Sequence, residues 1–119
     1  MPLIGLLSPL DSPDVISSWS FAHALDHDAI DQALLAKFGT PINGVPLNPL
    51  PPLDQAESWL LRHQLKHTTM NAALGLDGED LTAFNLGQKD SLDAFAGENF
   101  SEHDSVHQTL ASLGVQVDG

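Results

Sequence analysis

The histidines of this 119-residue chain restrict the folds that it can adopt. All six fall into pairs whose members are four residues apart: His23/His27, His63/His67 and His103/His107. Residues four apart lie on one face of an α-helix, so each pair would point two imidazoles in the same direction. The fold must therefore provide three helical faces that carry paired imidazoles.

Apolar residues recur at helical spacing around the second and third pairs, which places these histidines in the middle of buried faces. The two predicted faces contain Ala56, Trp59, Leu60, Met70 and Leu74, and Leu92, Phe95, Ala96, Asn99, Val106 and Leu110. The first pair lies at the border of an apolar face, beside Ile30 and Leu34. If the second and third helices are antiparallel neighbours, burying their faces gathers His63, His67, His103 and His107 into one cluster.

Helix-stop and helix-start signals divide the chain into a small all-α bundle of about three helices. The first helix is expected from about Ser17 or Ser20 to Phe38, where Gly39 ends it. The second is expected to start with a capping box formed by Asp54 and Glu57 and to end at Leu74, before Gly75. The third should run from about Asp90 or Ser91 to Leu113, with Gly114 as its stop.

Proline-rich segments flank the predicted helices. Residues 1–16 are expected to form an extended arm, residues 40–53 an ordered connector within a helical domain 17–114, and residues 115–119 a short tail. Their apolar side chains need cover, and we predict that they contact partner subunits. The predicted contact residues are Leu3, Ile4, Leu6, Leu7, Val45, Leu47 and Leu50.

The charge balance excludes several functions. Sixteen acidic residues against four basic ones give a net charge of −12, which disfavours binding to nucleic acids and to anionic membranes. No apolar run reaches the ~18 residues of a membrane span, and the N-terminal segment does not resemble a signal peptide. Asp26, Asp28 and Asp31 are expected to mark a solvated side of the first helix. Arg62 and Lys66 are expected to form a solvated pair.

Two interpretations of the predicted histidine cluster remain open. Neutral imidazole is a common metal ligand, so His63, His67, His103 and His107 could hold zinc. Because Glu98, Glu102 and Asp104 are expected to point away from the buried face, such a site would contain histidines only. The alternative, which we favour, is a structural cluster of all six histidines, hydrogen-bonded to one another, to Asn99 and to backbone carbonyls, with no cofactor.

Catalysis finds little support in the sequence. Gln64 stands in His63–His67 where a zinc protease would carry its glutamate base. Ser101 and Thr68 lie near histidines, but no nucleophile elbow or phosphate-binding loop accompanies them. We therefore predict that the chain is not an enzyme.

Several segments resemble a family of small proteins encoded in tailed-phage genomes, among head and tail morphogenesis genes. The similarity covers about residues 19–114. Its segments are Trp59–Leu76, Trp19–His23, Asp80–Leu81 and Asn99–His103, followed by His107 and Leu113–Gly114. The family pattern differs in having a tryptophan where Phe95 or Ala96 stands here.

The resemblance implies a structural subunit of a virion, made in the host cytoplasm. Its partners would be other virion proteins and copies of itself. The neck, the head–tail connection or the tail is the expected location, and a capsid decoration or cement protein is the alternative.

Overall fold

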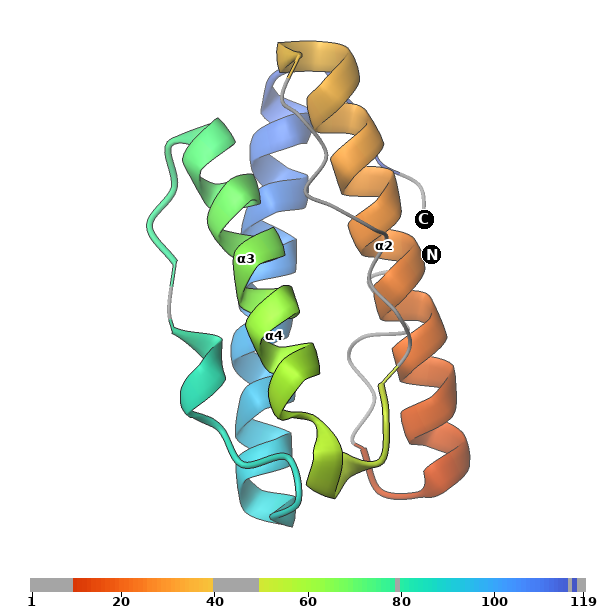
Figure 1. The fold of residues 1–119 in the computed structure, drawn as a ribbon. Helices are drawn as coiled ribbons and strands as arrows, with labels where there is room; N and C mark the ends of the chain where they lie inside the picture. The colour runs from red at the N-terminus through yellow and green to blue at the C-terminus, as the bar shows by residue number, and fades with distance from the viewer. Residues whose placement is uncertain (1–9, 40–49, 79, 116, 118–119) are drawn as a thin grey trace.

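The computed structural model describes residues 10–39, 50–78, 80–115 and 117 of the chain. Three α-helices dominate the described part: α2 (Pro13–Phe38), α3 (Glu57–Leu74) and α4 (Lys89–Ser112), as Figure 1 shows. Two short 3-10 helices, η1 (Leu53–Gln55) and η2 (Leu81–Ala83), precede α3 and α4. The described residues contain no strand, so the all-α prediction is confirmed.

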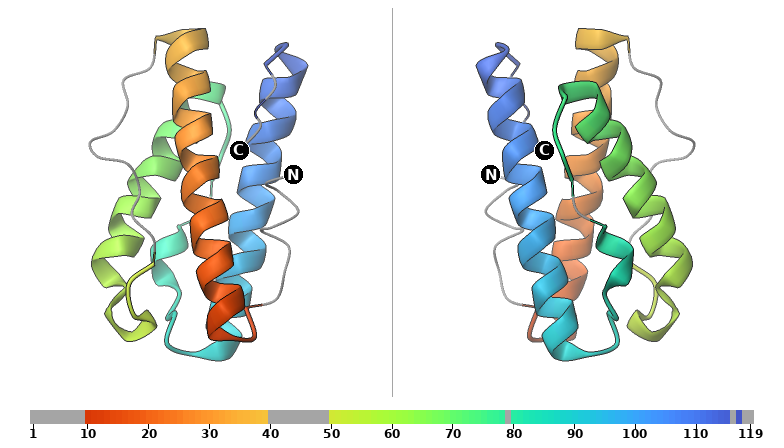
Figure 2. Two further views of the ribbon diagram at one scale, coloured as in Figure 1. Left: turned by 90° about the vertical axis from the view of Figure 1, so that its right-hand side faces the viewer. Right: turned by 90° about the vertical axis from the view of Figure 1, so that its left-hand side faces the viewer.

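All three helices run in the same direction. In Figure 1 each begins at the lower end of the bundle and ends at the upper end, and the side views of Figure 2 agree. Trp19 and Trp59, near two helix starts, both contact Phe95 near the start of the third. The second and third helices are therefore not the antiparallel neighbours that the sequence left as one possibility. The segments between the helices are long enough to return along α3, whose 18 residues span about 27 Å.

The first helix begins earlier than expected. Ser12 caps it by accepting a hydrogen bond from the Val15 backbone N–H at 3.3 Å, and Pro13 occupies the first helical position, where its missing N–H costs nothing. Residues 13–16, assigned to the arm from the sequence, belong to this helix. The predicted end at Phe38 is confirmed, with Gly39 in the left-handed conformation at φ 68°.

The predicted capping box of the second helix is wrong. Asp54 lies inside η1, and the helix starts after Ala56, with no side-chain cap among the described residues. Its predicted end at Leu74 is correct, and Gly75 follows at φ 69°. The third helix begins at Lys89, just before the expected Asp90, and ends at Ser112.

The parallel direction puts the buried faces of the helices in register. Each helix contributes one residue to each of five successive layers, and the spacing between these residues is the same in all three helices. The layers are Trp19/Trp59/Phe95, His23/His63/Asn99, His27/His67/His103, Ile30/Met70/Val106 and Leu34/Leu74/Leu110. Two polar layers therefore lie between apolar clusters at either end of the bundle.

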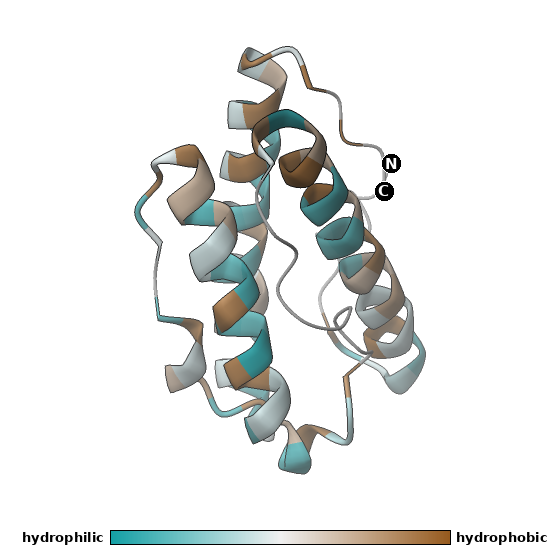
Figure 3. Ribbon diagram, turned by 45° about the horizontal axis from the view of Figure 1, so that its top comes forward, coloured by the Kyte–Doolittle hydropathy of each residue, from teal (hydrophilic) through white to brown (hydrophobic). Residues whose placement is uncertain are grey.

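The inward face of α2 is more polar than its outward face. Asp26 and Asp31 are buried, whereas Phe21 and Leu25 are more than half exposed. Figure 3 shows the corresponding mixture of hydrophilic and hydrophobic residues along the helices. The prediction that these aspartates are exposed to solvent is therefore wrong for Asp26 and Asp31, and correct for Asp28.

A buried ion pair links α2 to α3. Lys66 Nζ donates to Asp31 Oδ2 at 2.8 Å, and both side chains are nearly inaccessible to solvent. The prediction that Arg62 and Lys66 are both solvated is thus wrong for Lys66 and correct for Arg62, which is exposed. Among the described helices, none has the length and apolarity needed to cross a membrane.

Candidate metal centre

Five histidines from all three helices converge in the middle of the bundle. They are His23 and His27 from α2, His63 and His67 from α3, and His103 from α4. One ring nitrogen of each lies within 4.8 Å of the corresponding nitrogen of every other, and all five residues are buried. We call these five residues the histidine centre.

Some ring nitrogens have more close neighbours than a simple hydrogen-bond network allows. His23 Nε2 lies 3.2 Å from His27 Nε2 and 3.1 Å from His63 Nε2, and His27 Nε2 lies 3.1 Å from His103 Nε2. A neutral imidazole nitrogen carries either one proton or one lone pair. One nitrogen therefore cannot satisfy several such neighbours, whereas a cation among them can accept every lone pair.

Two carboxylates fix the orientation of two of these rings. His103 Nδ1 donates to Asp26 Oδ2 at 2.5 Å, and His67 Nδ1 donates to Glu102 Oε1 at 3.0 Å. With the proton on Nδ1, the Nε2 lone pair of each ring faces the centre. A carboxylate that orients a histidine in this way is the usual outer partner of a histidine metal ligand.

Each carboxylate also has a second partner. Asp26 Oδ1 accepts a hydrogen bond from His107 Nε2 at 2.7 Å, and Glu102 Oε1 accepts one from Asn71 Nδ2 at 3.1 Å. Asp26 is completely buried and Glu102 nearly so. Their positions are therefore held from two sides.

Burial keeps the imidazoles in the form that binds metals. Burial lowers the pKa of His23, His27 and His63 well below 6.5, and the neighbouring histidines lower it further. Burial lowers the pKa of His67 to about 4, even though Glu102 opposes the shift. These rings are neutral at pH 7 and keep a lone pair available.

At Asp26, hydrogen bonds outweigh the effect of burial on the pKa. Burial alone would raise the pKa of this carboxyl group, but hydrogen bonds from His103 and His107 hold it well below its usual range. Asp26 therefore stays ionised beside the histidine centre. A buried negative charge beside uncharged ligands favours a cation at the centre.

Apolar layers seal the centre on both sides. Trp19 stacks on His23 with ring centroids 4.5 Å apart, and Trp59 stacks on His63 at 4.8 Å, both with an interplanar angle of 12°. The layer of Ile30, Met70 and Val106 closes the other side, with each of the three completely buried. Little water can reach the imidazoles, so electrostatic interactions there are strong.

A purely structural network would leave several buried atoms without partners. Within the described part of the chain, the buried atoms that lack a hydrogen-bond partner are His23 Nδ1, His27 Nδ1, His63 Nδ1, His67 Nε2, Asn99 Nδ2 and Trp19 Nε1. Each such atom costs about 1–3 kcal/mol. A cation would satisfy one of these atoms, His67 Nε2, and would also resolve the crowding of the other Nε2 atoms, so metal binding explains the arrangement better.

The structure brings together a different set of histidines from the four predicted as possible metal ligands. His63, His67 and His103 are brought together as expected, but His107 lies outside the centre, on Asp26. His23 and His27, expected at the border of an apolar face, are buried in the middle of the core.

Sequence reasoning also missed the carboxylates. Glu102, expected to point away from the buried face, contacts His67, and Asp26 was assigned to solvent. One signal could have revealed the arrangement: Trp19, His23 and His27 have the same spacing as Trp59, His63 and His67, and as Phe95, Asn99 and His103. Equal spacing in all three helices is expected when they run parallel and in register.

The predicted partner-contact residues lie almost entirely outside the described part of the chain. Leu3, Ile4, Leu6, Leu7, Val45 and Leu47 fall in residues 1–9 and 40–49, so their contacts remain a prediction. Leu50 is described, and it packs partly buried against the apolar cluster around Trp19. Its backbone N–H donates to Ser20 Oγ at 2.6 Å.

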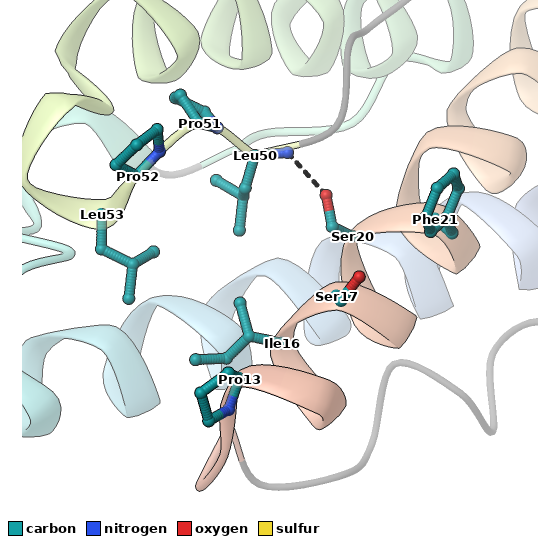
Figure 4. Close-up of a pocket in the computed structure, with 9 residues that line it drawn as sticks. All are labelled: Pro13, Ile16, Ser17, Ser20, Phe21, Leu50, Pro51, Pro52 and Leu53. Atoms are coloured by element: carbon teal, nitrogen blue, oxygen red, sulfur yellow. Dashed lines mark hydrogen bonds between the residues drawn. The ribbon is translucent and has the colours of Figure 1, made fainter.

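Leu50 also lines a hollow of about 380 Å³ between the start of α2 and the segment that precedes α3, shown in Figure 4. The lining is mostly apolar and includes Ile16, Phe21 and Leu53. None of the histidine-centre residues lines this hollow, so it is separate from the candidate metal centre.

None of the protein-family models, curated proteins or solved structures compared with this chain matches it.

Proposed function

We propose that this protein is a metal-binding helical module that holds one divalent transition-metal ion at the histidine centre. The observation that carries the proposal is the convergence of five buried imidazoles, with one nitrogen of each within 4.8 Å of all the others. Zinc was the alternative cofactor suggested by the sequence, at a different histidine set. The ligand set proposed here replaces His107 with His23 and His27.

The chemistry of the ligands supports a transition metal. Imidazole nitrogen suits Zn²⁺, Fe²⁺, Co²⁺, Ni²⁺ and Cu²⁺, whereas Mg²⁺ and Ca²⁺ prefer oxygen ligands. The chain has no cysteine to recruit a softer ion. The negative charge of Asp26, and that of an ionised Glu102, would offset the two positive charges of the ion.

The proposed role of the ion is structural. Its ligands come from all three helices, so binding would tie together elements that are distant in the sequence. Because the ligands are gathered only in the folded chain, the free energy of binding adds to the free energy of folding. The sealing aromatic and aliphatic layers suit a retained ion, and we propose no catalytic step.

Metal titration of the chelator-treated protein tests this function. We expect about one equivalent of ion per chain to resist dialysis and to raise the unfolding temperature. The variant His67→Ala should lose both effects, whereas Thr68→Ala, a change at an exposed position of the same helix, should retain the ion. Absence of stoichiometric metal and of any metal-dependent shift in wild-type protein would refute the proposal without recourse to variants.

A second candidate function concerns the surface. We propose, from the resemblance, that the protein is a subunit of a tailed-phage particle, in the neck, head–tail connection or tail, with capsid decoration as the alternative. The observation that favours a subunit is the exposure of Phe21, Leu25, Leu61 and Leu65, each more than half accessible to solvent. Aromatic residues such as Phe21 are enriched in the cores of protein interfaces, and Leu61 and Leu65 lie one helical turn apart on the same face of α3.

Sedimentation of the purified chain tests the assembly part of this second proposal. We expect concentration-dependent self-association that decreases in the double variant Leu61→Gln, Leu65→Gln. The double variant Glu57→Gln, Ser58→Gln on the exposed surface of the same helix is the control. A wild-type protein that stays monomeric at high concentration would contradict contacts between copies of the chain. In that case a different protein would have to cover these side chains.

A further inference from the structure

The two polar layers of the core supply six donor atoms rather than five. One layer contains His23, His63 and Asn99, and the next contains His27, His67 and His103. Each helix contributes one residue to each layer, one helical turn apart. Two stacked triangles of donors around a common point give six-coordination, which is octahedral when the triangles are staggered.

Asn99 occupies the position in its layer that a histidine occupies on the other two helices. It is completely buried, and its Oδ1 lies 2.9 Å from His63 Nε2 and 3.2 Å from His23 Nε2. These distances match those between the histidine nitrogens themselves. The amide oxygen therefore sits among the ring nitrogens as one more donor atom.

We infer that the histidine centre binds its ion with six ligands, the sixth being Asn99 Oδ1, and that it selects an ion with octahedral preference such as Fe²⁺, Co²⁺ or Ni²⁺ over tetrahedral Zn²⁺. This inference rests on the proposed metal-binding function. It adds the coordination number, the sixth ligand and the class of ion.

The distances favour six ligands over four. Six ligands about 2.1 Å from an ion lie about 3.0 Å from their neighbours and about 4.2 Å from the ligand opposite, whereas tetrahedral ligands lie about 3.4 Å apart. The measured distances between adjacent donors are 2.9, 3.1 and 3.2 Å, and the five histidine donors extend to separations within 4.8 Å. A tetrahedron has no place for a fifth imidazole, and its edge of about 3.4 Å is longer than these three distances.

A full set of six protein ligands has a consequence for activity. No coordination position is left for water or a substrate, in contrast to catalytic metal sites, which keep one open. The six-coordinate centre thus agrees with a retained structural ion. The harder oxygen donor of Asn99 also disfavours soft ions such as Cu⁺.

The absorption spectrum of the Co²⁺-loaded protein tests the inference, because six-coordinate Co²⁺ absorbs visible light weakly and four-coordinate Co²⁺ absorbs it strongly. We expect wild-type protein to bind about one Co²⁺ with weak bands. Asn99→Leu should intensify the bands and weaken Co²⁺ binding at least about tenfold. Gln108→Leu, which removes an exposed amide from the same helix, should change neither.

Each outcome has a separate meaning. Intense four-coordinate bands in wild-type protein would overturn the six-ligand centre and leave the metal-binding function intact. Failure of wild-type protein to bind Co²⁺, Zn²⁺ or Ni²⁺ would overturn the function itself. If Asn99→Leu does not fold, Asn99→Asp supplies the second variant: its carboxylate oxygen should preserve the weak bands, and intensified bands would exclude an oxygen ligand at this position.

Discussion

Glu102 accepts a hydrogen bond from His67 Nδ1 at 3.0 Å across the interface between α4 and α3. This contact fixes the proton on Nδ1 and turns the Nε2 lone pair of His67 toward the other imidazoles. A residue outside the histidine centre thus determines whether one of its ligands is oriented for binding.

Replacing Glu102 with glutamine should weaken metal binding while leaving the ligands in place. The neutral amide accepts the His67 proton less strongly, so the ring becomes a poorer donor, and we expect the affinity to fall about 10- to 100-fold. Competition with a chromophoric chelator measures the change. Glu98→Gln is the matched control, because Glu98 is exposed on the same helix, and an equal loss in both variants would contradict this role for Glu102.

The metal-free protein should lose stability as the pH falls from about 6.5 to about 4. The pKa values of His23, His27, His63 and His67 are lowered in the folded state, that of His67 to about 4, while 6.5 applies when unfolded. The unfolded chain therefore binds more protons in this range. The stability that results from these lowered pKa values is fully present above pH 6.5. As the pH falls toward 4, the free energy of unfolding decreases by about 1.4 kcal/mol per pH unit for each additional proton that the unfolded chain binds.

Urea unfolding at a series of pH values measures this dependence. Adding the metal should move the loss of stability to lower pH, because the ion competes with protons for the same lone pairs. A free energy of unfolding that stays constant between pH 7 and pH 5 would contradict the burial of neutral imidazoles.

Removing one partner of the buried ion pair should be costly. Lys66→Met leaves the carboxylate of Asp31 buried without its cation, and we expect a loss of about 3 kcal/mol, as is typical of broken buried pairs. Arg62→Met on the exposed side of the same helix should change the free energy of unfolding by less than about 0.5 kcal/mol. The double variant Lys66→Met, Asp31→Leu should recover most of the loss, and failure to do so would mean that packing rather than charge is responsible.

Two Gly→Ala substitutions should have opposite effects. A Cβ added at Gly78 would overlap Asn71 Nδ2, the group that donates to Glu102, so Gly78→Ala should destabilise the protein and weaken metal binding. Gly97 lies within α4 with open space around it, and Gly97→Ala should stabilise by about 0.5–1 kcal/mol. Thermal unfolding of both variants, with and without metal, checks the pair, and a stable Gly78→Ala variant with normal affinity would contradict the close contact.

The sequence predicted the helices better than their arrangement. Gly39 and Gly75 end helices as expected, because a left-handed glycine after an apolar repeat is a local signal. The direction of the helices depends on where the long connecting segments return, which no local pattern encodes. His103 and His63 could be assigned to the core from their apolar neighbours for the same local reason.

The first helix misled the prediction because its buried face is polar. Ser20, Asp26 and Asp31 face inward while Phe21 and Leu25 face outward, so hydrophobic periodicity identified only part of the buried face. Asp26 became buried only because His103 and His107, 77 and 81 residues away, supply its partners. A contact over that distance could not be derived without knowing that the helices are parallel.

The common direction of the three helices also bears on how the chain reaches its native state. No two of them form a hairpin, and the hydrogen bonds that join the histidine centre across the helices link residues separated by 35 to 77 positions. Loops of this length must close before the core can form, and such high contact order slows folding. Stopped-flow refolding should therefore be slower than that of an up-and-down bundle of equal size. Removing α4 would leave α2 and α3 without the third wall of their core.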